Sequence, residues 1–99
     1  MNMQQMLIQA QKMQREMQKK QAELEAQEFT VTKGGAVTAV VKGDKSIVSV
    51  SIDKDALDPD NKEMVEELIA LAINEAIEQI KAKEEQISSS MSGGMGGLF

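Results

Sequence analysis

The apolar residues near the start of the chain recur with a helical period. From Met3 to Gln27 there is no Gly or Pro, and apolar residues follow one another at spacings of three and four. They are Met3, Met6, Ala10, Met13, Met17 and Leu24, and Lys20 fills the one missing step. The spacing predicts a helix over about 3–27 with a narrow, heptad-like apolar seam. Because a narrow seam buries little area by itself, we expect it to pack on another helix.

From Phe29 to Ile52 the period changes to the two-residue alternation of strands. Apolar residues alternate with Thr, Ser or Lys over 29–32, 37–42 and 48–52. The runs are separated by Lys33-Gly34-Gly35 and by Lys42-Gly43-Asp44-Lys45, which suit tight hairpins because Gly accepts a positive φ. The pattern predicts a three-stranded antiparallel meander with one wet face and one face covered by a helix.

A second helix is predicted after an Asp-rich turn. Asp58 before Pro59 is typical of an N-cap followed by the first helical position, and Asp60 offers a second cap. The helical pattern runs to about Ile87. Acidic residues crowd its first two turns, where the helix dipole favours negative charge. Part of the acidity is therefore explained by the start of the helix rather than by a binding surface. These acids are Asp60, Glu63, Glu66 and Glu67.

The last part of the chain has no helical or strand period. Residues 88–99 are Ser, Gly and Met followed by Leu98 and Phe99, without charge. This composition predicts a flexible tail with a solvated end. The expected architecture is an α+β fold, with a single α-β-β-β-α domain over 1–87 and the tail over 88–99.

The apolar residues of the second helix cover more than the one stripe of a surface helix. One side is expected to pack on the sheet. Leaving the other side in water would forfeit about 1.5 to 3 kcal/mol for each large aliphatic residue, a large part of a small domain's stability. We therefore expect a homodimer whose interface includes the second helix. The interface residues predicted are Leu68, Ile69, Ala72, Ile73, Ala76, Ile77 and Ile80.

Composition excludes much chemistry. The chain has no Cys, His, Trp or Tyr, which rules out disulfides, thiolate or imidazole metal ligands, and nucleophiles activated by His. Asp53, Asp55, Asp58 and Asp60 lack the Gly-centred loop of calcium sites, so turn and cap roles are expected for them. There is neither a secretory start nor a membrane-spanning apolar run. We expect a cytoplasmic protein that is not an enzyme, with no cofactor, metal, small-molecule substrate or membrane partner.

The net charge of -5 is unevenly distributed. Residues 1–28 are balanced, residues 29–54 carry +2, and residues 55–99 carry -7. Within the balanced part, Lys12, Arg15 and Lys19 stand at steps of three and four, on a helix face directed away from the Met seam. The chain is thus not uniformly basic, but it offers one basic face.

Several short stretches together resemble the YbaB/EbfC family of bacterial nucleoid-associated proteins. The most specific stretch runs from Glu63 to Ala76, with its Glu-Glu-Leu-Ile and Ala-Ile-Asn-Glu-Ala blocks. Other matching residues are Gly34-Gly35, Val37, Gly43, Val50-Ser51-Ile52-Asp53 and Asp60; Lys54 departs from the Pro that members often carry there. The resemblance implies a tweezer-shaped homodimer, located in the cytoplasm and nucleoid, that binds DNA with little sequence preference. The family has no base-reading motif that can be carried over to residues of this chain.

The DNA contacts are therefore inferred from the charges. Regularly spaced cations can follow phosphates without reading bases. The candidates are Lys12, Arg15 and Lys19, with Lys20, Lys81 and Lys83 from helix ends or loops. Four-residue pairs with Glu16 and Glu23 offer a simpler role for the same cations, as part of a solvated helix face. An alternative function is a dimeric protein-interaction module for DNA repair or replication, with the acidic C-terminal half as the working surface.

Overall fold

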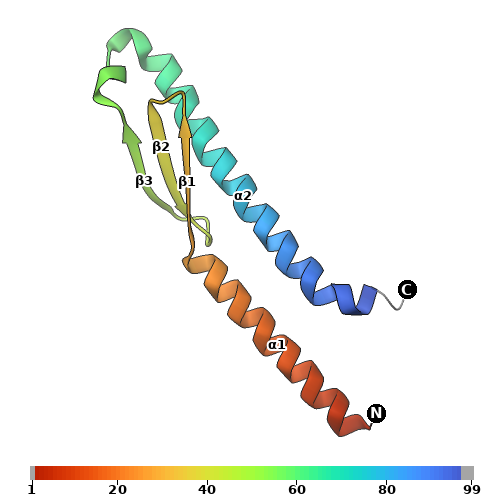
Figure 1. Cartoon of the computed structure of the whole chain (residues 1–99). Coiled ribbons are helices and arrows are strands. Elements are labelled where there is room, and N and C mark those ends of the chain that lie inside the picture. Colours follow the sequence, from red (N-terminus) through yellow and green to blue (C-terminus); the bar gives the residue numbers. More distant parts are fainter. Residues whose placement is uncertain (1, 97–99) are drawn as a thin grey trace.

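The computed structural model describes residues 2–96, and the side chains of residues 2–90. The elements are α1 (Met3–Ala26), β1 (Glu28–Lys33), β2 (Val37–Lys42), β3 (Ile47–Ile52), the short 3-10 turns η1 (Lys54–Ala56) and η2 (Pro59–Asn61), and α2 (Lys62–Gly96). Figure 1 shows an elongated molecule in which α2 lies along the sheet and α1 extends away from it. Its principal extents are 70 × 25 × 14 Å. The order of elements confirms the predicted α+β fold class.

The sheet is the predicted meander. Its strand order is β1-β2-β3, and both pairings are antiparallel, with Val31 opposite Ala39 and Ala39 opposite Val50. Alternate residues of β1 and β2 are buried, because successive side chains of a strand point to opposite faces. The outer face carries polar residues, among them Thr32 and Thr38, whose hydroxyls lie 2.9 Å apart. Over β1 and β2, one face is therefore covered and the other is polar, as predicted.

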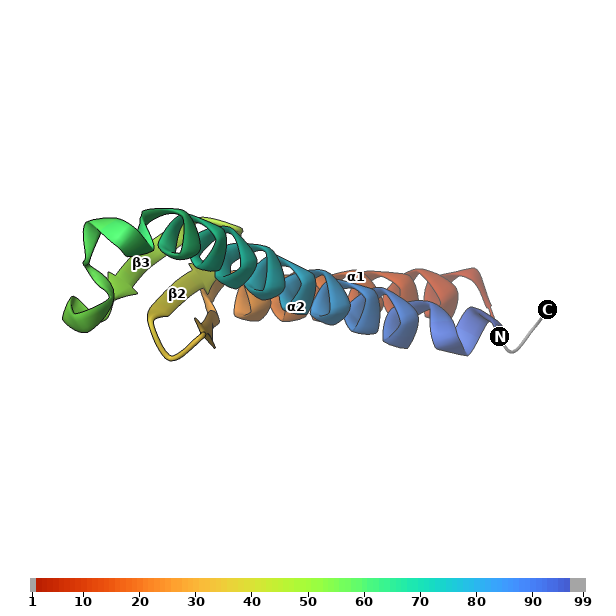
Figure 2. The same ribbon diagram turned by 90° about the horizontal axis from the view of Figure 1, so that it is seen from above.

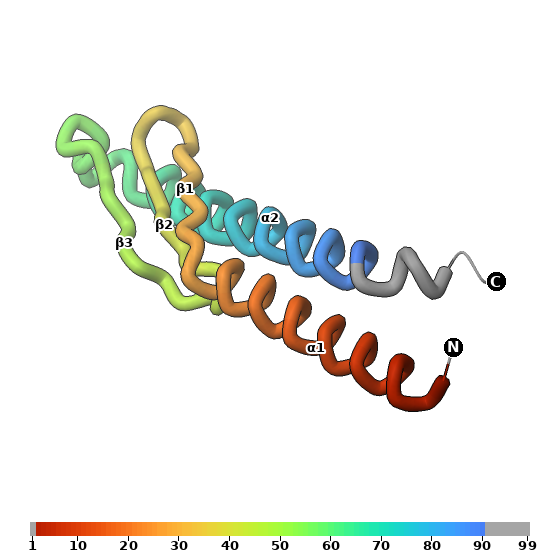
Figure 3. Tube along the Cα trace, turned by 60° about the horizontal axis from the view of Figure 1, so that its bottom comes forward, coloured from red at the N-terminus to blue at the C-terminus, as the bar shows by residue number. Residues whose placement is uncertain are grey.

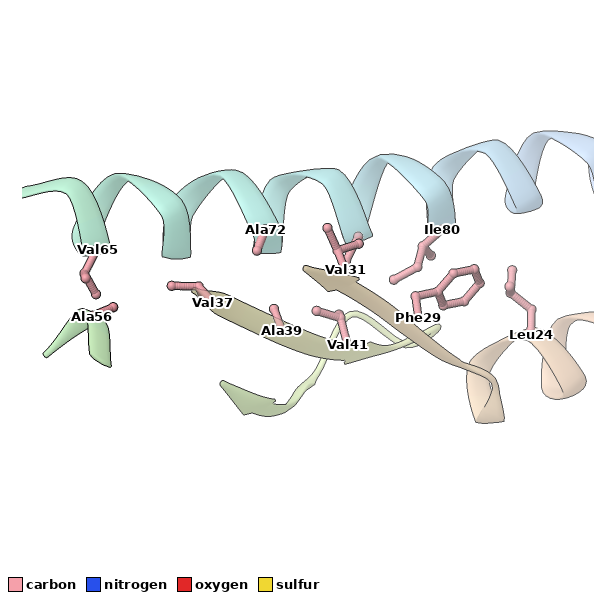
Figure 4. Packing of buried hydrophobic residues seen from close by; sticks show 11 residues of the cluster. Leu24, Phe29, Val31, Val37, Ala39, Val41, Ala56, Val65, Ala72 and Ile80 are labelled. Atoms are coloured by element: carbon pink, nitrogen blue, oxygen red, sulfur yellow. The ribbon is translucent and has the colours of Figure 1, made fainter. Parts of the chain in front are cut away.

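The core lies between α2 and the inner face of β1 and β2 (Figure 4). Ala72, Ala76 and Ile80 of α2 have no exposed surface, and small Ala side chains let the helix approach the sheet closely. From α1, only Leu24 among the described residues joins this cluster, where it lies near Phe29 and Ile80 in Figure 4. The buried strand residues are Phe29, Val31, Val37, Ala39 and Val41.

The start of α2 lies within two residues of the second predicted cap, Asp60, whereas its other end lies beyond the predicted one. Asp58 caps the turn η2, where its Oδ1 accepts the N–H of Asp60 at 2.8 Å, and α2 itself begins only at Lys62. At the other end helical backbone continues past Ile87 to Gly96, since no Pro interrupts it, and the Ser90 hydroxyl donates to the Ile87 carbonyl at 3.0 Å. The predicted end near Ile87 is therefore too early. Whether 88–99 is flexible stays a prediction, and Leu98 and Phe99 lie outside the described residues.

The two hairpins use their Gly residues differently. Gly34 and Gly35 have φ of 60° and 63°, as predicted for a turn that needs a positive φ. In the second hairpin, however, Lys45 adopts the positive φ, 72°, and Gly43 has another role. Its N–H donates to the Gln27 carbonyl at 2.9 Å, and a Cβ added to it would lie 1.8 Å from the carbonyl oxygen of Leu24. Gly43 is thus the point where the sheet touches the backbone of α1.

Candidate nucleic-acid interface

α1 is an arm attached to the rest of the chain at its C-terminal end. Asn2 caps its start by accepting the N–H of Gln5 at 2.8 Å, and Gln27 then turns the chain directly into β1. All side chains of α1 are exposed except those of Leu24, which is buried, and Met17, which is half-buried. Figures 2 and 3 show α1 and the C-terminal half of α2 extending from the sheet in the same direction. The arm can therefore be approached from most sides.

The predicted basic stripe lies on this arm. Lys12, Arg15 and Lys19 are all exposed. Within residues 2–90, whose side chains are described, none of the three forms an ion pair, so the expected pairs with Glu16 and Glu23 do not form. Lys12, Arg15 and Lys19 are thus available as cations for an external anion.

The other three predicted cations divide into two groups. Lys20 and Lys83 line the same shallow groove between α1 and α2, together with Glu23, so the structure brings these two together across the helices. Lys81 pairs with Glu78 of its own helix at 3.7 Å, although both side chains are mostly exposed. Lys81 is therefore the weakest candidate, since its charge is partly compensated.

Two other Lys residues tie the sheet to α2. The Nζ of Lys33 lies 2.8 Å from Glu75 Oε1, and that of Lys45 lies 3.3 Å from Glu84 Oε1. These pairs join residues 42 and 39 positions apart, so spacing in the sequence gives no sign of them. They identify the two sides of α2: Glu75 faces the end of β1, and Glu84 faces the loop before β3.

The predicted dimer surface on α2 needs correction. Ala72, Ala76 and Ile80 are fully buried in the chain's own core, so they cannot contact a partner. The sequence shows that α2 has two apolar sides, and the sheet takes the side of Ala72, Ala76 and Ile80. Leu68, Ile69 and Ile73 lie at the edge of the core and stay partly exposed, and Ile77 is half-buried.

An apolar surface that the sequence prediction missed lies on β3. A helix is about 10 Å across and strands are about 4.8 Å apart, so one helix covers two strands and leaves the third open. α2 packs on β1 and β2 and touches β3 little. Ile47, Val48 and Val50 consequently stay 54%, 48% and 38% exposed. The signal that could have revealed the open strand is the number of predicted elements, because one helix cannot cover three strands.

This open surface continues onto α2. Ile77 precedes Glu84 by seven residues and Ile73 precedes it by eleven, and both spacings place the residues on the same side of α2. Glu84 pairs with Lys45, next to β3. Leu71 is exposed too, but it shares the opposite side with Glu75 and Leu68, which contacts the β1 end near Gly34. The β3 surface is defined here as Ile47, Val48, Val50, Ile69, Ile73 and Ile77.

A cavity of about 450 Å³ lies where α1, α2 and the second hairpin meet. Its wall combines Met17, Leu24 and Ile87 with the ion pair of Lys45 and Glu84. Among the described residues, no three acidic side chains converge on a common point that could hold a metal. The Asp side chains at the start of α2 instead cap turns, with Asp53 Oδ1 accepting the N–H of Asp55 at 3.0 Å.

One carboxyl group near this cavity has a perturbed pKa. Hydrogen bonds from the hydroxyl and then the N–H of Ser46 hold the pKa of Asp44 below its ordinary value, because they stabilise the carboxylate. Such hydrogen bonds from Ser46 to the Asp44 side chain are typical of a turn. Within the described part of the chain, neither helix has an apolar stretch long enough to cross a membrane.

The α-β-β-β-α chain thus combines a sheet covered by α2 with a projecting helix whose unpaired cations form one positively charged face. A family model described as the YbaB/EbfC DNA-binding family matches residues 1–95. The chain belongs to this family.

Individual relatives agree with that assignment. A nucleoid-associated protein of Clostridium kluyveri is 45% identical over 98 residues, which are 98% of this chain and 83% of that protein. A nucleoid-associated protein of Chloroflexus aurantiacus is 39% identical, with both chains fully covered. The crystal structure of an uncharacterized protein from Helicobacter pylori superposes with a TM-score of 0.74 at 20% identity, covering 92% of this chain and 97% of that one. This last likeness concerns the fold alone.

Proposed function

We propose that this chain is a nucleoid-associated protein of the bacterial cytoplasm that binds duplex DNA as a homodimer, mainly through phosphates. The observation that carries the proposal is the row of unpaired cations Lys12, Arg15 and Lys19 on an exposed, projecting helix. Membership of a DNA-binding family and the names of the relatives support it. Such binding would affect nucleoid organisation and gene expression.

The geometry favours backbone contacts over base reading. The cations of the stripe are spaced along the helix by about 4 to 6 Å, at about 1.5 Å per residue, and long Lys and Arg side chains can follow phosphates over that length. Two chains of net charge -5 give a dimer of -10, which repels DNA at long range. At about 0.15 M salt charges are screened beyond about 8 Å, so the local stripe decides. Binding is therefore expected to be weak, salt-dependent and nearly insensitive to sequence.

The proposed dimer forms through the β3 surface. Its half-exposed aliphatic side chains stand side by side on β3 and on the adjoining side of α2, and a second copy would cover them with an equivalent surface. Burial of this surface removes the energetic penalty expected from a second helix with two apolar sides. The arms α1 of both chains lie outside this interface, and each dimer then presents two basic stripes.

A titration of duplex DNA across salt concentrations tests the DNA-binding proposal. Changing Lys12, Arg15 and Lys19 together to Gln should preserve the fold and lower the slope of log K against log salt by up to about 0.9 per lost phosphate contact. The matched control changes Lys42, Lys54 and Lys62 to Gln, which removes the same charge from the body of the molecule. If both triple variants weaken binding equally, net charge rather than the α1 stripe is responsible. If the unchanged protein binds no duplex even at low salt, the protein-interaction alternative replaces this proposal.

Sedimentation at micromolar concentration tests the dimer. Ile47→Glu or Ile73→Glu should produce monomers, because each places a charge in the β3 surface. Leu71→Glu is the control: this residue is as exposed as Ile47, at 54%, but lies on the other side of α2. A folded monomer of the unchanged protein contradicts the proposal, and so does a dimer that only Leu71→Glu disrupts.

A further inference from the structure

The basic face of α1 also carries an isoleucine. Ile8 precedes Lys12 by four residues and is 62% exposed. At about 100° per residue, Ile8 lies within about 40° of Lys12 and within about 20° of Arg15 and Lys19 around the helix axis. The four side chains thus form one row, with the apolar member nearest the N-terminal end of the arm.

Packing within the chain does not account for this residue. The helical seam that leads to the core runs through Met13, Met17 and Leu24, about half a turn away from Ile8. Exposure alone is unremarkable, since isolated apolar residues are common on protein surfaces. What distinguishes Ile8 is its alignment with unpaired cations, because whatever anion those cations bind is brought against it.

The arm around Ile8 is free of negative charge. No acidic residue occurs in the first turn of α1, and residues 2–11 contain no charged side chain. A phosphate-bearing surface can therefore approach this end without repulsion. The N-terminal helix dipole adds a weak attraction in the same direction.

We propose that Ile8 is a base-contacting residue that covers the C5-methyl groups of thymines in the major groove, while Lys12, Arg15 and Lys19 hold the flanking phosphates. This inference rests on the DNA binding proposed above. A helix 10 to 12 Å in diameter fits the major groove, about 12 Å wide, and the thymine methyl is the apolar group exposed there. The N-terminal end of the arm enters the groove and places Ile8 at the base edges, whereas the cations lie about 6 to 16 Å further along the helix, where the arm crosses a strand.

The contact gives a modest preference rather than a sequence code. An aliphatic side chain makes no hydrogen bond to a base, so it distinguishes only the presence or absence of a methyl group. Burying one methyl group changes affinity by about fourfold. Binding thus stays broad, with a bias toward duplexes that place thymines under the arm.

Duplexes with deoxyuridine in place of thymidine isolate this contact, because they lose the methyl groups but keep charge and base pairing. Affinities for both duplexes are measured by fluorescence anisotropy at one salt concentration, for the unchanged protein, Ile8→Ala and Leu7→Ala. Leu7 is the matched control: it is 59% exposed and lies next to Ile8, but about 100° away around the helix. The unchanged protein and Leu7→Ala should prefer the thymidine duplex about fourfold per methyl contacted, and Ile8→Ala should lose the preference.

The salt slope should be the same for all three proteins, because no phosphate contact is removed. Equal affinity of the unchanged protein for both duplexes overturns the role of Ile8 and leaves the phosphate-based proposal intact. A preference that survives in Ile8→Ala, or that Leu7→Ala also loses, overturns it too. If the unchanged protein binds neither duplex, both proposals fail together.

Discussion

Both helices carry apolar residues at helical spacing, yet their surroundings in the structure are different. α2 lies along the sheet, and Ala72, Ala76 and Ile80 on its inner side have no exposed surface. α1, described over its whole length of 24 residues, buries only Leu24. Tertiary packing therefore supports α2, whereas most of α1 depends on its own capping and helix propensity.

Because of this difference, substitutions that affect binding and substitutions that affect stability are expected in different helices. Substitutions on the outer part of α1 meet no core residue, so charge and shape there can change without loss of the fold. Substitutions along the inner side of α2 act on the core directly. The one link between the regions is the last turn of α1, where Leu24 enters the core and Gly43 touches the α1 backbone.

The largest effect is expected in the core. Ile80→Ala should lower the free energy of unfolding by about 4 kcal/mol, because it leaves a cavity among fully buried neighbours. Leu7→Ala, on the exposed arm, should change it by less than about 0.5 kcal/mol. Chemical denaturation monitored by circular dichroism measures both. Similar losses for the two variants would show that α1 is packed in solution and that the contrast between the helices is false.

A smaller effect is expected where the two regions meet. Gly43→Ala should cost about 3 kcal/mol, because the new Cβ meets the carbonyl of Leu24 and forces the hairpin away from α1. Gly35→Ala is the control: its Cβ has no neighbour within 4 Å, so only the positive φ opposes it, at about 1 kcal/mol. Thermal unfolding compares the two. Equal costs would mean that the hairpin can move away from α1 with little strain, so that the close approach to Leu24 does not explain Gly43.

The sequence predicts regular elements well because their periods are local. The seam of α1, the alternation in the strands and the apolar residues of α2 all report on which side of an element is buried. They do not report on the partner. For that reason the pattern predicts Ala72 and Ile80 for a dimer interface although the sheet covers them, and it does not indicate that Ile47 on β3 is exposed.

The glycines show the same limit, because the sequence does not indicate which distant segment a residue contacts. A Gly in a hairpin suggests a positive φ, and this is correct for Gly34 and Gly35. At Gly43 the requirement comes from α1, which lies about 20 residues earlier in the sequence, and Lys45 adopts the positive φ instead. A contact between distant segments leaves no periodic signal, so only the structure distinguishes the two cases.

The far end of α2 offers a third test of the contrast. Amides of residues 88–96 should exchange hydrogen with an opening free energy near zero, because Ser and Gly are poor helix formers and the sheet ends before this segment. Amides of Ala72, Ala76 and Ile80 should exchange only at free energies close to global unfolding. Exchange measured by NMR tests both. Strong protection of 88–96 would contradict the predicted flexible tail.

The smallest effect is expected in the turn that holds Gly43 against α1. The Ser46 hydroxyl, followed by its N–H, lowers the pKa of Asp44, so Ser46→Ala should raise this pKa toward its ordinary value of 3.8. Because the pKa is lowered in the folded state, the bond stabilises the fold above the unfolded value and loses its effect as pH falls through the folded pKa. The stability difference between the two proteins should thus be present near neutral pH and disappear in strong acid. NMR titration of the Asp44 carboxyl measures the shift, with Lys42→Gln as the control, since the charge of Lys42 lowers this pKa less than Ser46 does. An Asp44 pKa that Lys42→Gln raises more than Ser46→Ala does would mean that charge, and not the turn hydrogen bonds, sets it.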